Sequence, residues 1–310
     1  MVNFQFLIFL LFSPLLQGVI KKLKALCQGR VGAGIFQPYS DLARLFQKEM
    51  VIPESASWVF HAAPFIVFLS VLAASMMAPV ISGAAPVFGM GDIIALLYTL
   101  ALGRFFLTLA GLDAGTAFGG EGSSREATVA ILVEPTMGLA IFTAAIAAGS
   151  TGLAAISKSS HILQSPAHLL AFAAFFVALL AETGRIPVDN PDTHLELTMI
   201  HEGMVLEYSG RYLAMLEWAH FIKQMLLFTV AIDLFFPFGI FTNGGPLTIA
   251  GGSALSAGAW YCLKLLVLAA AVALTESSRA KLRFFQLPSL LGGAFVLALL
   301  SIITFVMLGR

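Results

Sequence analysis

Carboxylates crowd one stretch near the middle of the sequence, between residues 182 and 207. The six acids of this stretch are Glu182, Asp189, Asp192, Glu196, Glu202 and Glu207. Apolar residues such as Met199, Ile200 and Met204 are interspersed with them, so we expect much of the stretch to be buried. Burial raises the pKa of a carboxyl group and lets it exchange protons near neutral pH. The pattern predicts a partly buried proton-exchanging site, with a solvated acidic loop as the alternative.

The histidines and cysteines do not show the spacing of a metal site. His194 and His201 are seven residues apart and share a helical face, but a zinc helix needs its second His four residues after the first. Cys27 and Cys262 give neither a metal-ligand spacing nor a disulfide framework. We therefore expect no metal or haem site and no catalytic residue in this chain, and we assign the histidines to capping, hydrogen bonding or proton relay.

Further ionisable residues fall inside apolar runs, where each costs roughly 2.5–3.5 kcal/mol on insertion scales. They are Arg104, Glu134, Glu217, Lys223, Asp233 and Lys264. Arg104 and Glu134 lie at matching depths in consecutive runs, which suits either a structural ion pair or a part in proton movement. Glu217, His220 and Gln224 share one helical face. Because several lipid-facing charges would cost more than the about 5–15 kcal/mol of a fold's net stability, we expect the six to face the helix bundle.

The elements that hold these residues are membrane spans. The chain has 310 residues, of which 59% are hydrophobic and 11% charged, and its mean hydropathy is +0.92. A soluble domain has about 25% charged residues. A span needs about 20 mostly apolar residues, and eight such runs lie near 2–20, 61–82, 92–112, 127–149, 167–186, 212–238, 255–276 and 289–309. We predict an all-α integral membrane protein, a single membrane domain over residues 1–310 with about eight transmembrane helices and amphipathic cytoplasmic helices.

Lys and Arg mark one side of this domain. Twelve of the 17 basic residues lie in four alternate connections, at 21–60, 113–126, 182–211 and 277–288. The positive-inside rule makes these segments cytoplasmic and places both termini outside. The first run lacks a basic start and a cleavage site, so we expect a retained helix. The 17 acids balance the 17 bases and no long basic run occurs, which argues against nucleic acid as a partner.

The segment from Gly29 to Glu49 reads as a glycine-rich turn that enters an amphipathic helix along the membrane surface. Its glycines are not spaced as a phosphate-binding loop. Together with 182–211 it offers a large mixed polar and apolar area, so we expect these segments to dock a soluble partner. The candidate docking residues are Arg30, Gln37, Asp41, Arg44, Arg125 and Arg185.

At these residues the chain resembles the complex I subunit 1 family over essentially its whole length. Three stretches carry the resemblance, Gly29–Glu49, Gly111–Pro135 and Ala181–Gly210. In the third, the family's motif is matched by Glu182, Arg185, Pro187, Asp189, Glu196 and the run Glu207-Tyr208-Ser209-Gly210. The spacing before Glu207 is longer, and the first loop shorter, than in the quinone-reducing members. In both respects the chain is more similar to the hydrogenase-4 branch, which is found in membrane-bound energy-converting nickel-iron hydrogenases and formate hydrogenlyases.

This resemblance implies a membrane anchor and coupling subunit of a multisubunit oxidoreductase in a bacterial or archaeal cytoplasmic membrane. The nickel-iron centre and iron–sulfur clusters would belong to partners, a hydrogenase large subunit and an iron–sulfur small subunit on the cytoplasmic side. Redox energy would pass through antiporter-like membrane subunits to proton or sodium translocation. The candidate coupling residues are the six acids of the first stretch and the six charges within the runs.

Two alternatives stay open. The chain could be the quinone-chamber subunit of a respiratory NADH dehydrogenase, complex I. It could also be a stand-alone ion-coupled secondary transporter, although the paired halves with broken helices that such transporters usually show are not evident in the sequence.

Overall fold

The structure, a computed structural model, describes residues 5–80, 91–157, 165–189, 199–237 and 254–308. Within these ranges the regular secondary structure is helical, apart from an isolated β-bridge between Asp92 and Gly152. The predicted all-α fold class is therefore confirmed.

Seven described helices are long and apolar enough to cross a membrane. They are α1 (Gln5–Cys27), α3 (Trp58–Met77), α4 (Ile93–Asp113), α5 (Ala117–Ala148), α9 (Gly210–Phe235), α10 (Ala254–Ser278) and α11 (Leu287–Leu308). The remaining predicted run, near 167–186, forms α7 (Pro166–Glu182), an apolar helix of 17 residues. At 1.5 Å per residue it is about 25 Å long, close to the shortest length that spans a bilayer. The short helices are α2 (Gln37–Gln47), α6 (Leu153–Ile156), α8 (His201–Val205) and the single 3₁₀ turn η3 (Phe284–Gln286).

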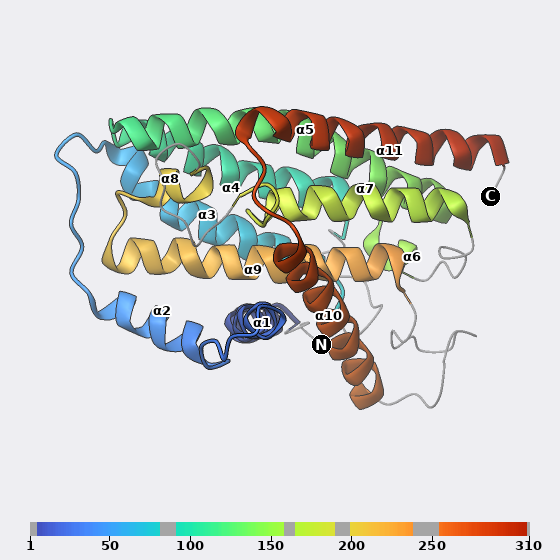
Figure 1. The fold of residues 1–310 in the computed structure, drawn as a ribbon, viewed down its shortest axis with the longest axis horizontal. Helices are drawn as coiled ribbons and strands as arrows, with labels where there is room; N and C mark the ends of the chain where they lie inside the picture. The colour runs from blue at the N-terminus through green and yellow to red at the C-terminus, as the bar shows by residue number, and fades with distance from the viewer. Residues whose placement is uncertain (1–4, 81–90, 158–164, 190–198, 238–253, 309–310) are drawn as a thin grey trace.

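Most of the long helices run side by side along the longest axis of the molecule (Figure 1). In this group α5, α7 and α11 pack against one another, and α3 packs on α4 and α9. Helix α1 is seen nearly end-on and α10 runs obliquely, so both cross the main group steeply while packing on each other. Helix α9 is the core helix, since every residue from Gln224 to Phe235 is buried. The end of the bundle that carries α2 and α8 is called the basic end below.

Polar side chains fix where several helices begin. Ser57, Asp92, Thr116 and Ser165 each accept a hydrogen bond from a backbone N–H of the first turn of α3, α4, α5 and α7, respectively. Such caps satisfy donors that have no partner inside the helix. Asp113, at the end of α4, also accepts the backbone N–H groups of Ser57 and Phe60, which ties α4 to the start of α3.

Two helix ends differ from the sequence prediction. Helix α1 continues to Cys27 rather than stopping near residue 20, and α5 begins at Ala117 rather than near 127. Hydropathy ends a run at the first charged or polar residues, whereas backbone hydrogen bonding continues through them. The basic residues 21–24 and the acid Glu126 therefore lie on helices, not in connecting loops.

The predicted amphipathic helix within 29–49 is present as α2, with Leu42 buried and Phe46 edge-to-face with Trp218 at a ring-centroid distance of 6.2 Å. In the segment 182–211 the structure describes α8, from His201 to Val205. The candidate residues Asp192 and Glu196 lie outside the described residues.

Candidate functional site

A buried set of ion pairs joins four helices near the basic end of the bundle. Arg104 on α4 contacts Glu134 (Nη1–Oε1, 2.8 Å) and Glu126 (Nε–Oε1, 3.6 Å) on α5, and Glu182 at the end of α7. Lys223 on α9 contacts the same Oε1 atom of Glu182 at 2.7 Å. We call these five residues the inner network. Two cations then offset three carboxylates, which lowers the cost of holding charge within a membrane span.

The Arg104–Glu134 pair predicted from matching depths is confirmed. One carboxylate oxygen of Glu134 reaches Arg104 in the bundle, while the Glu134 side chain remains 50% exposed. Both residues line a cavity of about 240 Å³ that also contacts Glu182, Tyr98 and Phe142. The inner network therefore opens on the face formed by α4 and α5.

A second set of charges surrounds a larger cavity, of about 490 Å³, which we call the charged cavity. Helix α1, the α1–α2 connection, the segment after α7, α8 and α9 all contribute to it. Its charged and histidine residues are Lys21, Lys24, Arg30, Arg185, Asp189, His201, Glu202, Glu217 and His220. The predicted common face of α9 is confirmed, because Glu217 and His220 both line this cavity and Gln224 lies next along the same face.

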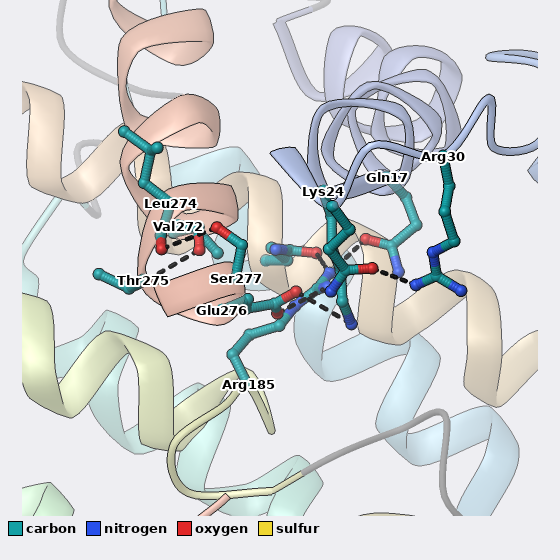
Figure 2. A network of polar contacts seen from close by, with 11 residues as sticks. Gln17, Lys24, Arg30, Arg185, Val272, Leu274, Thr275, Glu276 and Ser277 are labelled. Atoms are coloured by element: carbon teal, nitrogen blue, oxygen red, sulfur yellow. Dashed lines mark hydrogen bonds and ion pairs between the residues drawn. The ribbon is translucent and has the colours of Figure 1, made fainter. Parts of the chain in front are cut away.

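Arg185 is a buried residue that lines the charged cavity and holds its surroundings together through hydrogen bonds. Its guanidinium donates to Gln224 (2.7 Å), to Glu276 (3.2 Å) and to Gln17, and Lys24 pairs with Glu276 at 3.3 Å. Figure 2 shows Arg185, Glu276, Lys24 and Gln17 pointing toward one another from the turn after α7, from α10 and from α1. The predicted docking role of Arg185 is wrong, because the residue is only 3% exposed and its donors point to partners within the chain.

Asp189 connects the charged cavity to the linker between α10 and α11. Its carboxylate accepts Lys281 Nζ at 2.7 Å and the backbone N–H of His201 at 3.2 Å. The imidazole of His201 lies over that of His220 with ring centroids 4.9 Å apart. Burial and the nearby Lys223 lower the pKa of His201, against an opposing attraction from Glu217. The lowered pKa favours the neutral form of this imidazole.

The described acids of the stretch 182–207 are divided between several places. Asp189 and Glu202 line the charged cavity, whereas Glu182 belongs to the inner network. Glu207 is half-buried and is not part of the cavity lining. The next residue, Tyr208, stacks on Phe60 with centroids 4.0 Å apart and donates its hydroxyl to the Phe60 carbonyl at 2.9 Å. These two contacts of Tyr208 hold the segment that contains Glu207 against the start of α3.

Asp233 and Lys264 lie far from the basic end. Both are buried, as expected, and Lys264 donates to the backbone carbonyl of Phe236 at 2.8 Å, just beyond the end of α9. Asp233 follows Lys223 by ten residues on one helix, about 15 Å along its axis. The residues between them are buried and uncharged, so this chain provides no ionisable bridge along α9 between the two positions.

The predicted docking residues other than Arg185 stay on the surface. Arg30 and Arg44 are exposed, and Gln37 donates to Asp41 at 2.8 Å along α2. Arg125 is partly covered, because it donates to the Met199 carbonyl (2.9 Å) and to Glu121 (2.7 Å).

Glu126 and Gln17 are among the polar residues of the site that were not predicted. Glu126 was assigned to a loop, but on the continuous α5 it lies eight residues before Glu134 and on the same face. That spacing is the signal that could have identified it. Gln17 is a single amide within an apolar run, and it becomes meaningful only when Arg185 is placed beside it.

Within the ranges that the structure describes, no group of three or more His, Cys, Asp or Glu side chains is arranged to hold a metal ion. Cys27 and Cys262 are free thiols on the surface. The site as described offers ion pairs, hydrogen bonds and proton-accepting groups.

Comparison with known proteins gives matches over nearly the whole chain. The family model described as NADH dehydrogenase matches residues 1–308. The chain is 36% identical to hydrogenase-4 component C of Escherichia coli (strain K12) over 299 residues, which cover 96% of this chain and 92% of that protein. It is 33% identical to formate hydrogenlyase subunit 4 of the same strain over 306 residues, covering 97% and 96% of the two chains.

More distant matches extend the comparison. The chain is 30% identical to an NADH-quinone oxidoreductase subunit of Anaplasma phagocytophilum (strain HZ) over 275 residues, which cover 82% of this chain and 77% of that protein. Among solved structures, a chain of the archaeal membrane-bound sulfane sulfur reductase superposes with a TM-score of 0.77 at 19% identity, covering 96% and 97% of the two chains. That superposition supports the fold.

Proposed function

Because the chain belongs to the NADH dehydrogenase family, we propose that it is the membrane anchor and coupling subunit of an energy-converting hydrogenase complex. The two hydrogenase relatives match nearly its full length, which favours this branch of the family. The resemblance predicted from the sequence is confirmed by the same matches.

One structural observation carries the proposal. The charged cavity and the inner network adjoin, because Glu182 ends α7 and Arg185 follows it by three residues, while Lys223 and Gln224 are consecutive on α9. A proton taken up or released in the cavity would change the field at Arg185 and at Lys223, the residue before its partner Gln224. Buried ion pairs with more than one available partner can rearrange when one charge changes. Redox events beside the cavity can thus be transmitted to Glu134 on the α4–α5 face.

The partners follow from this arrangement. The basic end, with Arg30 and Arg44 on its surface, would face the cytoplasm and dock a hydrogenase large subunit together with an iron–sulfur small subunit. The nickel-iron centre and the iron–sulfur clusters would belong to these subunits. Antiporter-like membrane subunits would pack against the α4–α5 face, where Glu134 is open. A bacterial or archaeal cytoplasmic membrane, with both termini outside, fits this orientation.

A quinone-reducing role in a respiratory NADH dehydrogenase is the second candidate, favoured by the NADH-quinone oxidoreductase relatives. Quinone rings and tails need a largely apolar pocket. The lining of the charged cavity is dominated by Lys, Arg, His, Asp and Glu side chains, which suits protons and water better than a quinone. A stand-alone transporter is less favoured, since nearly full-length relatives are named as components or subunits of larger enzymes.

The test is to isolate the native complex through an affinity tag on this chain and to identify its subunits by mass spectrometry. We expect a nickel-iron large subunit and an iron–sulfur small subunit, and hydrogen turnover coupled to an ion gradient in sealed vesicles. NADH-linked flavin subunits in their place, with quinone-dependent activity, would overturn the proposal.

A further inference from the structure

A second cavity at the basic end lies where the α10–α11 linker meets α5 and α8. Its volume is about 590 Å³, and we call it the linker cavity. Six apolar residues form most of its wall, namely Val188, Ile200, Leu282, Phe284, Phe285 and Leu287. Arg125, Lys281 and Arg283 complete the lining. Among the described residues that line it, none is acidic. The cavity thus combines an apolar wall with three cations.

Neighbouring groups hold two of these cations in place. The Arg125 guanidinium donates to the Met199 carbonyl and to Glu121, and it lies 5.9 Å from the centre of the Phe284 ring. Lys281 donates to Asp189 at 2.7 Å. Arg283, between the linker and η3, is exposed to solvent. A negatively charged ligand would therefore meet a preformed basic wall with one accessible guanidinium at its edge.

The position of the linker cavity selects the kind of ligand. The linker leads directly into α11, a helix apolar enough to span the membrane and mostly unburied within this chain. Phe285, at its start, is 92% exposed, which places a large apolar side chain at the water end of a span. Aromatic and basic residues at this level anchor to lipid headgroups and the first part of their chains. The ligand should be anionic at one end and apolar at the other.

We propose that the linker cavity is a binding site for an anionic phospholipid. Arg283 would bind the phosphate from solvent, while the apolar wall and Phe285 would hold the upper acyl chain. Basic pockets between spans on the cytoplasmic side select such headgroups by charge. Lys281 lines this cavity and also holds Asp189, so the lipid would lie one ion pair away from the charged cavity. The inference does not depend on the proposed hydrogenase function.

The test uses the purified complex, stripped of lipid in detergent and titrated with dioleoyl phosphatidylglycerol or dioleoyl phosphatidylcholine while bound lipid is counted by native mass spectrometry. We expect preferential retention of phosphatidylglycerol. Arg283→Glu should weaken its binding about fivefold or more, the factor that corresponds to the loss of one cation at an anionic surface. Arg279→Glu is the matched control, since Arg279 is exposed on the same linker but does not line the cavity. Phe285→Ser should also weaken binding.

Several outcomes would overturn the site. Equal binding of the two lipids would remove the role of charge. Equal losses of lipid binding in the Arg283→Glu and Arg279→Glu variants would show that the effect comes from general surface charge and not from the linker cavity. If glycerol phosphate competed as strongly as the lipid, the apolar wall would make no contribution to binding. Protection of an Arg283→Cys thiol from maleimide by another subunit, with or without lipid, would assign the cavity to a protein contact.

Discussion

Glu182 is the residue on which the inner network converges. Its side chain is 4% exposed and forms ion pairs with both Arg104 and Lys223. Breaking a buried ion pair by removing one partner costs about 3–5 kcal/mol, because the remaining charges stay buried without compensation. We expect Glu182→Gln to lower the thermal stability of the complex and to reduce ion translocation per hydrogen turned over.

The matched control is Glu121→Gln. Glu121 pairs with Arg125 four residues away, but its side chain is mostly exposed. A surface pair of this kind contributes about 0.3–0.5 kcal/mol. Similar losses of stability in the two variants would contradict the special position of Glu182.

His201 gives the site a pH dependence. Its pKa is lowered in the folded chain, chiefly by burial and then by Lys223, with Glu217, Asp189 and Glu182 opposing. Folding therefore favours the neutral imidazole, and no stability is lost while the pH stays above the ordinary pKa of about 6.5. As the pH falls from there toward the lowered pKa, the unfolded chain binds the proton more readily and the folded chain loses stability.

We accordingly expect the melting temperature of the complex to fall between pH 7 and pH 5, and His201→Gln to flatten that slope. His61 is exposed and hydrogen-bonded to Tyr212, so His61→Gln should leave the slope unchanged. A slope that persists in His201→Gln would assign the effect to other groups.

The sequence located some of these residues and misplaced others for a physical reason. Matching depth in consecutive spans was enough to pair Arg104 with Glu134. Arg185 looked like a surface cation because it lies at the cytoplasmic end of an apolar run. Its partner Glu276 lies 91 residues further along the chain, and a single sequence contains no signal for that contact.

At the scale of elements, the contact between α5 and α8 depends on a missing side chain. A Cβ atom added to Gly122 would lie 2.9 Å from the Ile200 carbonyl oxygen and 3.0 Å from the Met204 nitrogen. These are backbone atoms that cannot move aside without moving α8. Overpacking of this kind costs about 1–3 kcal/mol. We expect Gly122→Ala to destabilise the complex in thermal unfolding and to displace His201.

Gly120 provides the control two residues earlier on the same helix. A Cβ atom there would meet nothing within 4 Å. Gly120→Ala should be neutral or slightly stabilising, since Ala is the better helix former. If both variants melted alike, the close approach of α8 would not be the cause.

The elements themselves were largely predictable, and their geometry was not. All eight apolar runs form helices, because twenty or so apolar residues have few other ways to satisfy their backbone in lipid. The steep crossing of α1 and α10 cannot be predicted from hydropathy. Hydropathy indicates whether a segment lies in lipid or in water, and not the direction in which its helix runs. That crossing brings Glu276 to Lys24, which lines the charged cavity.

At the scale of the whole molecule, the basic end should hold the soluble partner. Arg44 on α2 has a side chain that is 71% exposed, and Arg30 is exposed at the mouth of the charged cavity. Reversing both charges should reduce the recovery of soluble subunits on washed membranes, because rim charges guide association. Arg44→Lys together with Arg30→Lys keeps the charge and should assemble normally. Full recovery in the reversed variant would exclude this surface as the interface.

The last prediction concerns where an ion path leaves the chain. Along α9, Lys223 and Asp233 are separated by about 15 Å of buried, uncharged residues, far more than one hydrogen bond can bridge. Glu134, in contrast, is joined to the inner network through Arg104 and is open on the α4–α5 face. We therefore expect the path to run sideways through Glu134 to a neighbouring membrane subunit.

Two isosteric variants separate the routes. Glu134→Gln should assemble normally yet lower ion translocation per hydrogen formed, measured in sealed vesicles alongside hydrogen turnover. Asp233→Asn should leave that ratio close to the unmodified value, since Asp233 would serve packing near the end of α9. Loss of coupling in Asp233→Asn with normal coupling in Glu134→Gln would reverse the assignment and require a path across the apolar middle of α9. Loss of assembly in Glu134→Gln would instead make its pair with Arg104 structural.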